Sequence, residues 1–453
     1  MTTTPVNTSL VLNPNTTQHG NTELQTTVVL LLALTILAFG TIMFYCCLKT
    51  GFRTIGPLSD ELGQHFLRLE ATQRGKILHD TQMQHVASDF ARFNGVKFTK
   101  KDVERARALV YCRHKNNTIT TVKLGYGVMS RCPALFSIAH SILKKMHRQV
   151  TVIVNTYDEP ISLPSSLPLH EPGEYVTNED CSGEKSSRGN HLSLASLTPT
   201  AKHDMLRSSP FFTDPTTFPA TDLAFPYFSN TKPNNAYADI IACLYNNAGC
   251  MTKNLNVDKF SSVPWAQKEN RLVWRGSSTG GQVGGKYSLA HYPRFRIIDW
   301  SKNTPLRHKI NVDIALTSYY QPQATIDLLS LKTTYPLGTY QTIETQFKAK
   351  YLLVIDGHTW ANRTAAFLCA GSVVLFTTVF NDWVSRQIKP WVHYVPLEMD
   401  YSDLDNKLLW LIDHDDEARE IGRRGKEFAE RELDFSSMQL YNAALVLEYA
   451  KLF

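Results

Sequence analysis

Residues 271–281 read RLVWRGSSTGG, an apolar run followed by an arginine, glycines and hydroxyl-bearing side chains. If the apolar run is a strand, the glycine-rich turn after it presents backbone N–H groups to an anion. Arg275 adds a guanidinium that can hold two phosphate oxygens at once, and Gly276 lets a ligand approach the backbone closely. The stretch predicts a phosphate-binding loop, although a plain polar turn at a strand end has a similar composition.

A second loop of this kind lies within residues 351–371, YLLVIDGHTWANRTAAFLCAG. The apolar run Tyr351–Ile355 predicts a buried strand that leads into Gly357, and Arg363 falls in the predicted first turn of a helix. The backbone N–H groups just before Arg363 lie at the positive end of that helix, where an anion is stabilised. Two such loops in one half of the chain together predict a diphosphate site.

A glycine motif between the two loops points to different chemistry. Residues 280–286, GGQVGGK, match the first seven positions of a P-loop, the phosphate-binding motif of many NTPases. The next position requires Ser or Thr to bind magnesium, and this chain has Tyr287 there. Tyrosine cannot take that role, so the sequence disfavours an NTPase.

Composition bounds the kind of protein that carries these loops. The chain has 453 residues, enough for two domains, and its 43% hydrophobic and 19% charged residues are typical of a globular protein with a core. The net charge of +6 is mild, and no run of Lys and Arg is interleaved with aromatic residues. The sequence therefore disfavours nucleic-acid binding, and the small basic excess suits an anionic small substrate.

Strand and helix patterns alternate around the loops. RLVWRG and KYLLVIDG are predicted strands, and TAAFLCAGSVVLF predicts a helix that runs into a third strand. In the first half, FSIAHSILKKMHRQ has helical apolar spacing, and the buried run VTVIVN follows it. This alternation predicts an α/β fold with parallel sheets, in two Rossmann-like domains with a cleft between them.

The N-terminal region has a different composition. From Val28 to Cys47 no residue is charged, and a helix of this length matches a hydrocarbon core of about 30 Å. A signal peptide would begin with basic residues, whereas the first Lys or Arg here is Lys49, on the far side. The predicted segments are a disordered tail (1–27), a transmembrane helix (28–48), a stem (49–75), a first Rossmann-like domain (76–262) and a second Rossmann-like domain that carries both loops and ends in helices (263–453).

Four stretches occur in the order found in glycosyltransferase family 90, the CAP10-like or protein O-glucosyltransferase family. They are VPWAQKENRLVWRGSSTGG, KYLLVIDGHTWANR, IKPWVHYVPLEMDYSDL and EAREIGRRGKEFAERELDFSSMQLYNAALVLEYAKL. The chain resembles this family over nearly all of its second half. The resemblance implies a GT-B fold and inverting transfer of glucose or xylose from a UDP-sugar to a hydroxyl of a protein or glycan. It also implies that no metal or other cofactor is needed.

The resemblance assigns both loops to the diphosphate of the nucleotide-sugar. Arg294, in HYPRFR, is a further basic candidate. Trp360 either stacks on the uracil or the sugar, or packs in the core. The predicted nucleotide-sugar-binding residues are Arg275, Gly276, Ser277, Ser278, Thr279, Arg294, Gly357, Thr359, Trp360, Ala361 and Arg363.

The first half resembles the family in QVTVIVNTYDEP, which is similar to a strand that ends in a catalytic aspartate followed closely by proline. This maps the general base onto Asp158. Glu159 beside it departs from the pattern and leaves open which carboxylate faces the acceptor. A carboxylate in a cleft takes the proton of the acceptor hydroxyl as the new bond forms. Arginines and helix N–H groups then stabilise the leaving diphosphate in place of a metal.

Two further groups of residues invite a functional interpretation. Asp413 and Asp415 spell the D-x-D motif of metal-dependent glycosyltransferases, but they fall between predicted helices. We therefore expect helix-capping acids there and no metal site. Trp391, His393 and Tyr394 are expected to pack in the core beneath the site.

The charges that flank the apolar segment and the family resemblance predict opposite membrane orientations. Lys49 and Arg53 follow the apolar segment, which favours a cytosolic catalytic domain. The resemblance implies a lumenal domain in the Golgi or endoplasmic reticulum, and we adopt that expectation. In a lumenal domain six cysteines would permit three disulfides, and scattered buried thiols are the alternative; their spacing shows no metal signature. These six are Cys112, Cys132, Cys181, Cys243, Cys250 and Cys369.

The alternative of another class is a catalytically silent relative, a glycan-binding or scaffolding membrane protein that keeps the fold. The presence of Asp158 and of both loop arginines argues against it. Asn362 stands in a glycosylation sequon beside Arg363. A glycan there would block the predicted diphosphate site, so we expect Asn362 to be unmodified.

Overall fold

The structure is a computed structural model that describes the chain in segments. These are residues 57–113, 119–124, 134–155, 225–232, 238–244, 250, 263–280, 288–320 and 326–453. The predicted tail, the predicted transmembrane helix and Asp158 lie outside them. None of the helices in these segments is both long and apolar enough to cross a membrane. The chain divides into two units, Met1–Ser59 and Asp60–Phe453, and every strand described below belongs to the second.

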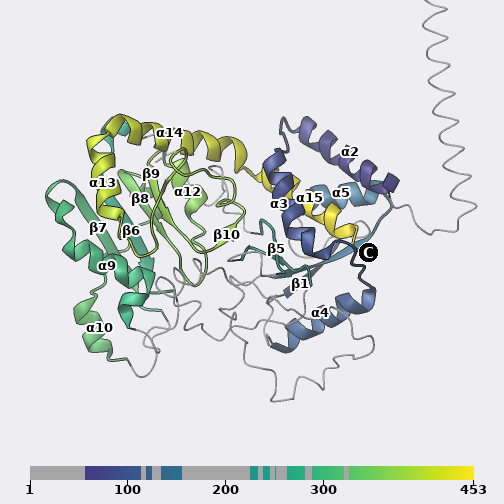
Figure 1. The fold of residues 1–453 in the computed structure, drawn as a ribbon, viewed down its shortest axis with the longest axis horizontal. Coiled ribbons are helices and arrows are strands. Elements are labelled where there is room, and N and C mark those ends of the chain that lie inside the picture. Colours follow the sequence, from purple (N-terminus) through teal and green to yellow (C-terminus); the bar gives the residue numbers. More distant parts are fainter. Residues whose placement is uncertain are drawn as a thin grey trace, which may run out of the picture. The chain divides into compact units, whose positions relative to one another are not determined.

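A five-stranded parallel sheet carries the two glycine-rich loops (Figure 1), and its strands are ordered β11-β9-β8-β6-β7. The bounds are β6 Glu269–Ser277, β7 Asn311–Ser318, β8 Ala349–Ile355, β9 Val373–Thr377 and β11 Val395–Pro396. The first of these strands in the chain, β6, lies between the second and the third, β7 and β8. This is the strand order of a flavodoxin-like doubly wound sheet. The predicted parallel sheet of the second half is confirmed.

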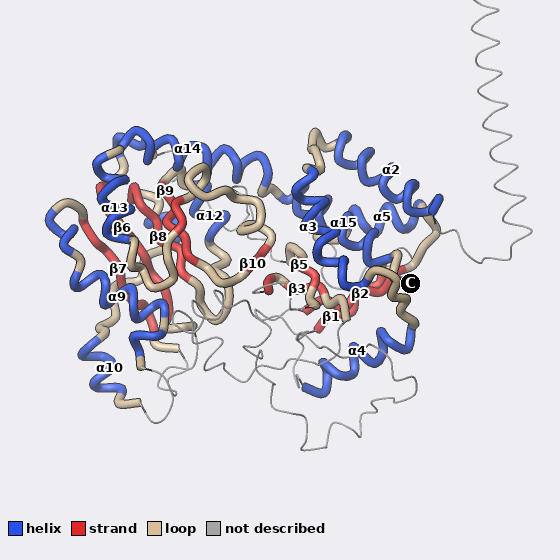
Figure 2. The backbone as a smooth tube through the Cα atoms, viewed as in Figure 1, coloured by secondary structure: helices blue, strands red, loops and turns tan. Residues whose placement is uncertain are grey.

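Alternate residues of the central strands enter two separate hydrophobic clusters. Leu352 and Val354 of β8 share one cluster with α12, whereas Leu353 and Ile355 share the other with α9 and α13. Because strand side chains alternate between faces, such apolar runs require helices on both sides of the sheet. Figure 2 shows these strands in red among the blue helices. The helices are α9 Pro293–Asn303, α10 Leu328–Thr334, α11 Ile343–Gln346, α12 Thr364–Cys369, α13 Leu404–Asp413 and α14 Asp415–Glu432.

A four-stranded sheet of order β1-β2-β3-β5 is built from the first half of the chain. β1 and β2 are antiparallel, and the other pairs are parallel. Its strands are β1 Ile119–Leu124, β2 Val150–Asn155, β3 Phe228–Ser229 and β5 Ile240–Ile241. The surrounding helices are α2 Pro57–Gln73, α3 Asp80–Phe90, α4 Lys100–Arg113, α5 Ser137–Lys145 and α15 Phe435–Ala450. The C-terminal helix α15 packs against α3 and α5 (Figure 1), while the predicted division at residue 262 stays a prediction.

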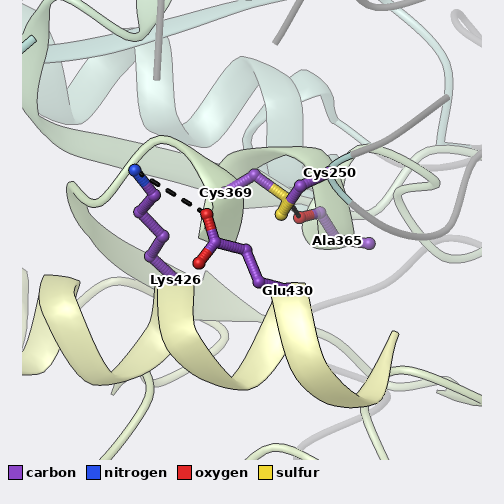
Figure 3. Close-up of a disulfide and its surroundings, with 5 residues drawn as sticks. All are labelled: Cys250, Ala365, Cys369, Lys426 and Glu430. Carbon is purple, nitrogen blue, oxygen red and sulfur yellow. Dashed lines mark hydrogen bonds and ion pairs between the residues drawn. A yellow bond between two sulfur atoms is a disulfide. The ribbon is translucent and has the colours of Figure 1, made fainter. Parts of the chain in front are cut away.

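Two links join segments that are far apart in the sequence. The short strand β4, Thr231–Lys232, pairs antiparallel with β10, Asn381–Asp382. A disulfide connects Cys250 to Cys369, the last residue of α12. Figure 3 shows this disulfide above α14, with Lys426 and Glu430 of that helix below it. Of the six cysteines, Cys243 is buried and free, and the side chains of Cys112, Cys132 and Cys181 lie outside the described residues.

A buried ionic network reinforces the first of these links. Lys232 Nζ lies 2.8 Å from Oδ1 of Asp89, and Arg386 donates to both carboxylate oxygens of Asp89 at 2.9 Å. The backbone N–H of Ile241 donates to Oδ2 of Asp89 at 3.1 Å. Burial alone would raise the pKa of Asp89, but the charges of Lys232 and Arg386 hold it below its usual value. The network therefore joins α3, β4, β5 and the turn after β10.

Candidate functional site

The two loops follow the strands at which the order of the five-stranded sheet reverses. The chain passes from β6 to β7 on one side, whereas β8 leads on to β9 and β11 on the other. In open α/β sheets, ligands bind beyond the carboxyl ends of the strands at such a switch point. The residues at that position are Ser277–Gly280, which begin with the last residue of β6, and Asp356–Arg363 after β8. The fold thus brings the two predicted loops to one place.

Arg294, in the first turn of α9, ties the loops together. Its Nε donates to the carbonyl of Asp356 at 2.8 Å, and its Nη1 donates to the carbonyl of Ser277 at 3.0 Å and to Thr279 Oγ1. A Cβ on Gly357 would lie 2.8 Å from Nη2 of Arg294, so only glycine fits there without a shift. Burial, together with the charge of Arg363, lowers the pKa of Arg294 to about 9. Arg294 is a buried cation that holds both loops.

The two arginines predicted to bind phosphate have different environments. Nη1 of Arg363 donates to the carbonyl of Arg275 at 2.5 Å, which connects the start of α12 to β6. The guanidinium of Arg275 is turned to β7, where it donates to the side chain and carbonyl of Asp313. Its Nε donates to the carbonyl of Thr339 at 2.9 Å. The fork of Arg275 is thus largely occupied by protein acceptors, and its phosphate contact stays a prediction.

Arg363 keeps more of its hydrogen-bonding capacity. Apart from the bond to the carbonyl of Arg275, its guanidinium makes no other hydrogen bond with the described residues. Its charge lies 5.7 Å from the ring centre of Phe367, and burial lowers its pKa. A half-buried guanidinium with unused donors is suited to an anionic ligand. Of the two, Arg363 is the stronger candidate for direct contact with a diphosphate.

The remaining predicted residues shape the loops. Ser278 Oγ accepts a hydrogen bond from the N–H of Tyr320 at 2.7 Å and so joins the loop to the end of β7. Gly280 has φ +124°, which disfavours other residues. The N–H of Gly357 donates to the carbonyl of Thr359 at 2.7 Å, which closes a tight turn. Gly276 lies within β6, Ser277 ends that strand, and the buried Ala361 and the partly buried Trp360 follow Thr359.

Two titratable groups in the second loop were not singled out from the sequence. Asp356 is buried at the end of β8, and its Oδ2 accepts from the N–H of Val379 at 2.8 Å. Burial raises the pKa of Asp356 to about 7, and its Oδ1 has no partner among the described residues. Burial and the charge of Arg294 lower the pKa of His358 to about 4. The sequence feature that could have identified Asp356 is a carboxylate directly after an apolar strand.

Two secondary expectations have different outcomes. Asp415 begins α14, where it pairs with Lys350 Nζ at 2.6 Å and accepts from Trp265 Nε1 at 2.8 Å. Asp413 and Asp415, which form the D-x-D pattern, therefore lie at the ends of two consecutive helices. No group of three or more metal-ligating side chains is present in the segments that the structure describes. The expectation that Trp391 is buried is wrong: it is 42% exposed and packs edge-on against Trp410 at the surface.

The neighbours of Trp391 are less exposed. His393 is partly buried, stacks on Phe428 with ring centres 4.4 Å apart, and accepts from the N–H of Lys389 at 3.1 Å. Tyr394 packs against the core edge-on to Phe376. The structure thus bears out a packing role for His393 and Tyr394. Asp158 and Glu159 lie outside the described residues, so the general base stays a prediction.

Known proteins resemble the second part of this chain. A family model described as glycosyl transferase family 90 matches residues 198–453, more than half of the chain. Protein O-glucosyltransferase 2 of Danio rerio is 29% identical over 201 residues, 44% of this chain and 36% of that protein. Protein O-glucosyltransferase 1 of Rattus norvegicus is 29% identical over 191 residues, 42% of this chain and 43% of that protein. The chain therefore spans less than half the length of these relatives.

A viral protein is also similar. The uncharacterized protein 179R of Invertebrate iridescent virus 6 is 27% identical over 213 residues, 43% of this chain and 18% of that protein. In each case the matched part is less than half of this chain.

Proposed function

Because the chain belongs to glycosyl transferase family 90, we propose that it transfers glucose or xylose from a UDP-sugar to a hydroxyl group of a protein or glycan. The observation that carries this proposal is the meeting of the two loops at the switch point of the five-stranded sheet. Arg294 holds both loops, and Arg363 reaches from one to the other. Such a site suits the diphosphate of a nucleotide-sugar.

In the proposed reaction, the chain's own cations stabilise the leaving UDP. The guanidinium of Arg363 contacts the diphosphate, and the buried charge of Arg294 adds to the positive potential there. Thr279 and Ser277 contribute hydroxyl groups from the first loop. We propose that this arrangement acts without a metal, with the sugar configuration inverted in one displacement on the GT-B fold that the family resemblance implies.

The proposed general base is Asp158. The strand β2, which is parallel to β3, ends at Asn155, and Asp158 comes three residues later in the sequence. Residues that act on ligands often follow the carboxyl ends of parallel strands. From there a carboxylate would remove the proton of the acceptor hydroxyl as that oxygen attacks the sugar carbon.

We also propose a lumenal location in the Golgi or endoplasmic reticulum, with residues 28–48 as the membrane anchor. The disulfide between Cys250 and Cys369 supports this orientation, since disulfides persist in oxidising compartments and are rare in the cytosol. The flanking charges of Lys49 and Arg53 favour the opposite orientation, and the disulfide outweighs this weak bias.

The test is UDP release from UDP-glucose and from UDP-xylose by the full-length chain and by its Asp158→Asn variant. We expect the native protein to release UDP with at least one donor, and the variant to lose most of that rate while still binding UDP. If the native protein turns over neither donor yet binds a glycan, the silent glycan-binding alternative replaces this proposal. Equal rates for native protein and variant would remove Asp158 from the mechanism.

A further inference from the structure

A pocket opens beside the second loop, between segments of both sheets. One wall comes from Asn230, just before β4, and from Ala242–Leu244 after β5. The other comes from Trp360 and Asn362 of the second loop and from the turn that follows β10. Because Asn362 immediately precedes Arg363, the pocket adjoins the site proposed for the diphosphate.

Two residues that line this pocket carry a buried hydrogen-bond donor without a partner in the described part of the chain. Asn230 is 4% exposed, and its Nδ2 has no acceptor among the described residues. Trp383 is 3% exposed, and its Nε1 likewise lacks an acceptor there. A buried donor without a partner is unfavourable, so native proteins rarely keep one without a reason. Two in one pocket point to a ligand that supplies acceptors.

The third polar group of the pocket is a carboxylate. Asp382 is 8% exposed, and its Oδ1 accepts from the N–H of Ser385 at 2.8 Å. Burial raises its pKa. A carboxylate in the pocket disfavours a phosphate group there, because both carry negative charge. As a hydrogen-bond acceptor, it favours a donor such as a hydroxyl group. Donors and an acceptor beside the apolar Leu244 and Ala365 suit a neutral ring with several hydroxyl groups.

The walls of the pocket are held in place before any ligand binds. Pairing of β4 with β10 sets Asp382 opposite Thr231, next to Asn230. The network around Asp89 holds Lys232, two residues after Asn230, and Arg386, two residues after Val384. The disulfide then connects Cys250, beyond Leu244, to α12, which contributes Ala365. A polar site on such supports loses little entropy when it binds.

We propose that this pocket receives the sugar ring of the donor and that Asn230, Asp382 and Trp383 hydrogen-bond its hydroxyl groups. The inference rests on the proposed function and names the residues that recognise the sugar rather than the UDP. Asn230 and Trp383 donate to hydroxyl oxygens, and the Asp382 carboxylate accepts from a hydroxyl hydrogen.

The test separates sugar recognition from UDP recognition. Affinities for UDP, UDP-glucose and UDP-xylose are measured by calorimetry on the full chain and on three variants, Asp382→Asn, Trp383→Phe and Asn230→Ala. We expect each variant to bind UDP within about twofold of the native chain and a preferred UDP-sugar about tenfold more weakly. Retained UDP affinity also shows that each variant is folded.

The matched control is Trp300→Phe. Trp300 of α9 also has an indole Nε1 without a partner among the described residues, but it packs in the other hydrophobic cluster and does not line the pocket. This variant should bind UDP and UDP-sugars as the native chain does. An equal loss in Trp300→Phe and Trp383→Phe would overturn the pocket's role.

Three outcomes contradict the inference in different ways. If the native chain binds no uridine nucleotide, the proposed function fails and the pocket assignment falls with it. If the native chain binds UDP-sugar and the pocket variants bind it equally well, only the pocket assignment is wrong. If the variants keep donor affinity but raise the KM for the acceptor, the pocket belongs to the acceptor instead.

Discussion

The five-stranded sheet and the region around β4 and β10 are stabilised in different ways. The sheet is built from strands such as β6 and β8, whose apolar residues are buried on both faces. β4 and β10 have two residues each, and buried ions and a disulfide support them. Apolar burial is distributed over many side chains, whereas a buried ion network depends on each of its members. The second region should therefore be far more sensitive to single substitutions.

The largest effect is expected for Asp89→Asn. The substitution leaves Lys232 and Arg386 buried with no carboxylate to balance them, and breaking a buried pair in this way costs about 3–5 kcal/mol. Urea denaturation measures the free energy of unfolding. Because the pKa of Asp89 is lowered in the folded protein, its stabilising contribution should also disappear as the pH falls through that lowered pKa.

Glu420→Gln is the control for that variant. Glu420 pairs with Arg423 and Arg424 on the exposed face of α14, where solvent screens the charges. The free energy of unfolding should change by less than about 1 kcal/mol. Similar losses in both variants would contradict the distinction between the two regions.

A somewhat smaller loss is expected when the disulfide is removed by Cys250→Ala and Cys369→Ala together. The bond joins residues 119 positions apart, so it restricts the unfolded chain strongly and contributes about 2–4 kcal/mol. Thermal unfolding measures the melting temperature. Adding reductant should lower the melting temperature of the native chain to that of the double variant, and it should not change the melting temperature of the double variant. Cys243→Ala, which removes a buried free thiol, should leave the response to reductant intact. A native chain indifferent to reductant would refute the prediction.

The five-stranded sheet allows a comparison between its two arginines. Arg363→Ala should weaken UDP binding about ten- to a hundredfold, because it removes charged hydrogen bonds of about 1.5–3 kcal/mol. Arg275→Ala should mainly lower the melting temperature, since its guanidinium binds Asp313 and Thr339. Calorimetry with UDP and thermal unfolding of both variants separate affinity from stability. The reverse result would assign the phosphate to Arg275.

These two arginines also show which features of the site the sequence could predict and which it could not. Arg275 lies near the end of an apolar strand and Arg363 in the polar loop after another, so the pattern predicted the two loops and a shared diphosphate site but not the strand order that brings them together. The direction of the Arg275 side chain depends on Asp313, which lies on a different strand. Strands of two residues such as β4 are too short to show any periodicity. Pairing of Cys250 with Cys369 depends on how separate segments pack, which spacing does not reveal.

The last prediction concerns pH and the two titratable groups of the second loop. With a folded-state pKa of about 7, Asp356 keeps a proton between about pH 4 and 7 that the unfolded chain releases. Its contribution to stability therefore falls as the pH rises, by at most about 1.4 kcal/mol per pH unit. His358, with a pKa of about 4, has the opposite effect between about pH 4 and 6.5, because the unfolded chain binds the proton there.

In the native protein these two contributions offset each other below about pH 6.5, and single variants should separate them. Asp356→Asn removes the falling contribution, so its stability relative to the native chain should rise from pH 4.5 to pH 6.5. His358→Gln should show the opposite trend over the same range. Urea denaturation of each variant at several pH values measures both slopes. Curves parallel to that of the native chain would mean that Asp356 and His358 are in ordinary contact with water and that the second loop does not form a buried, electrostatically perturbed site.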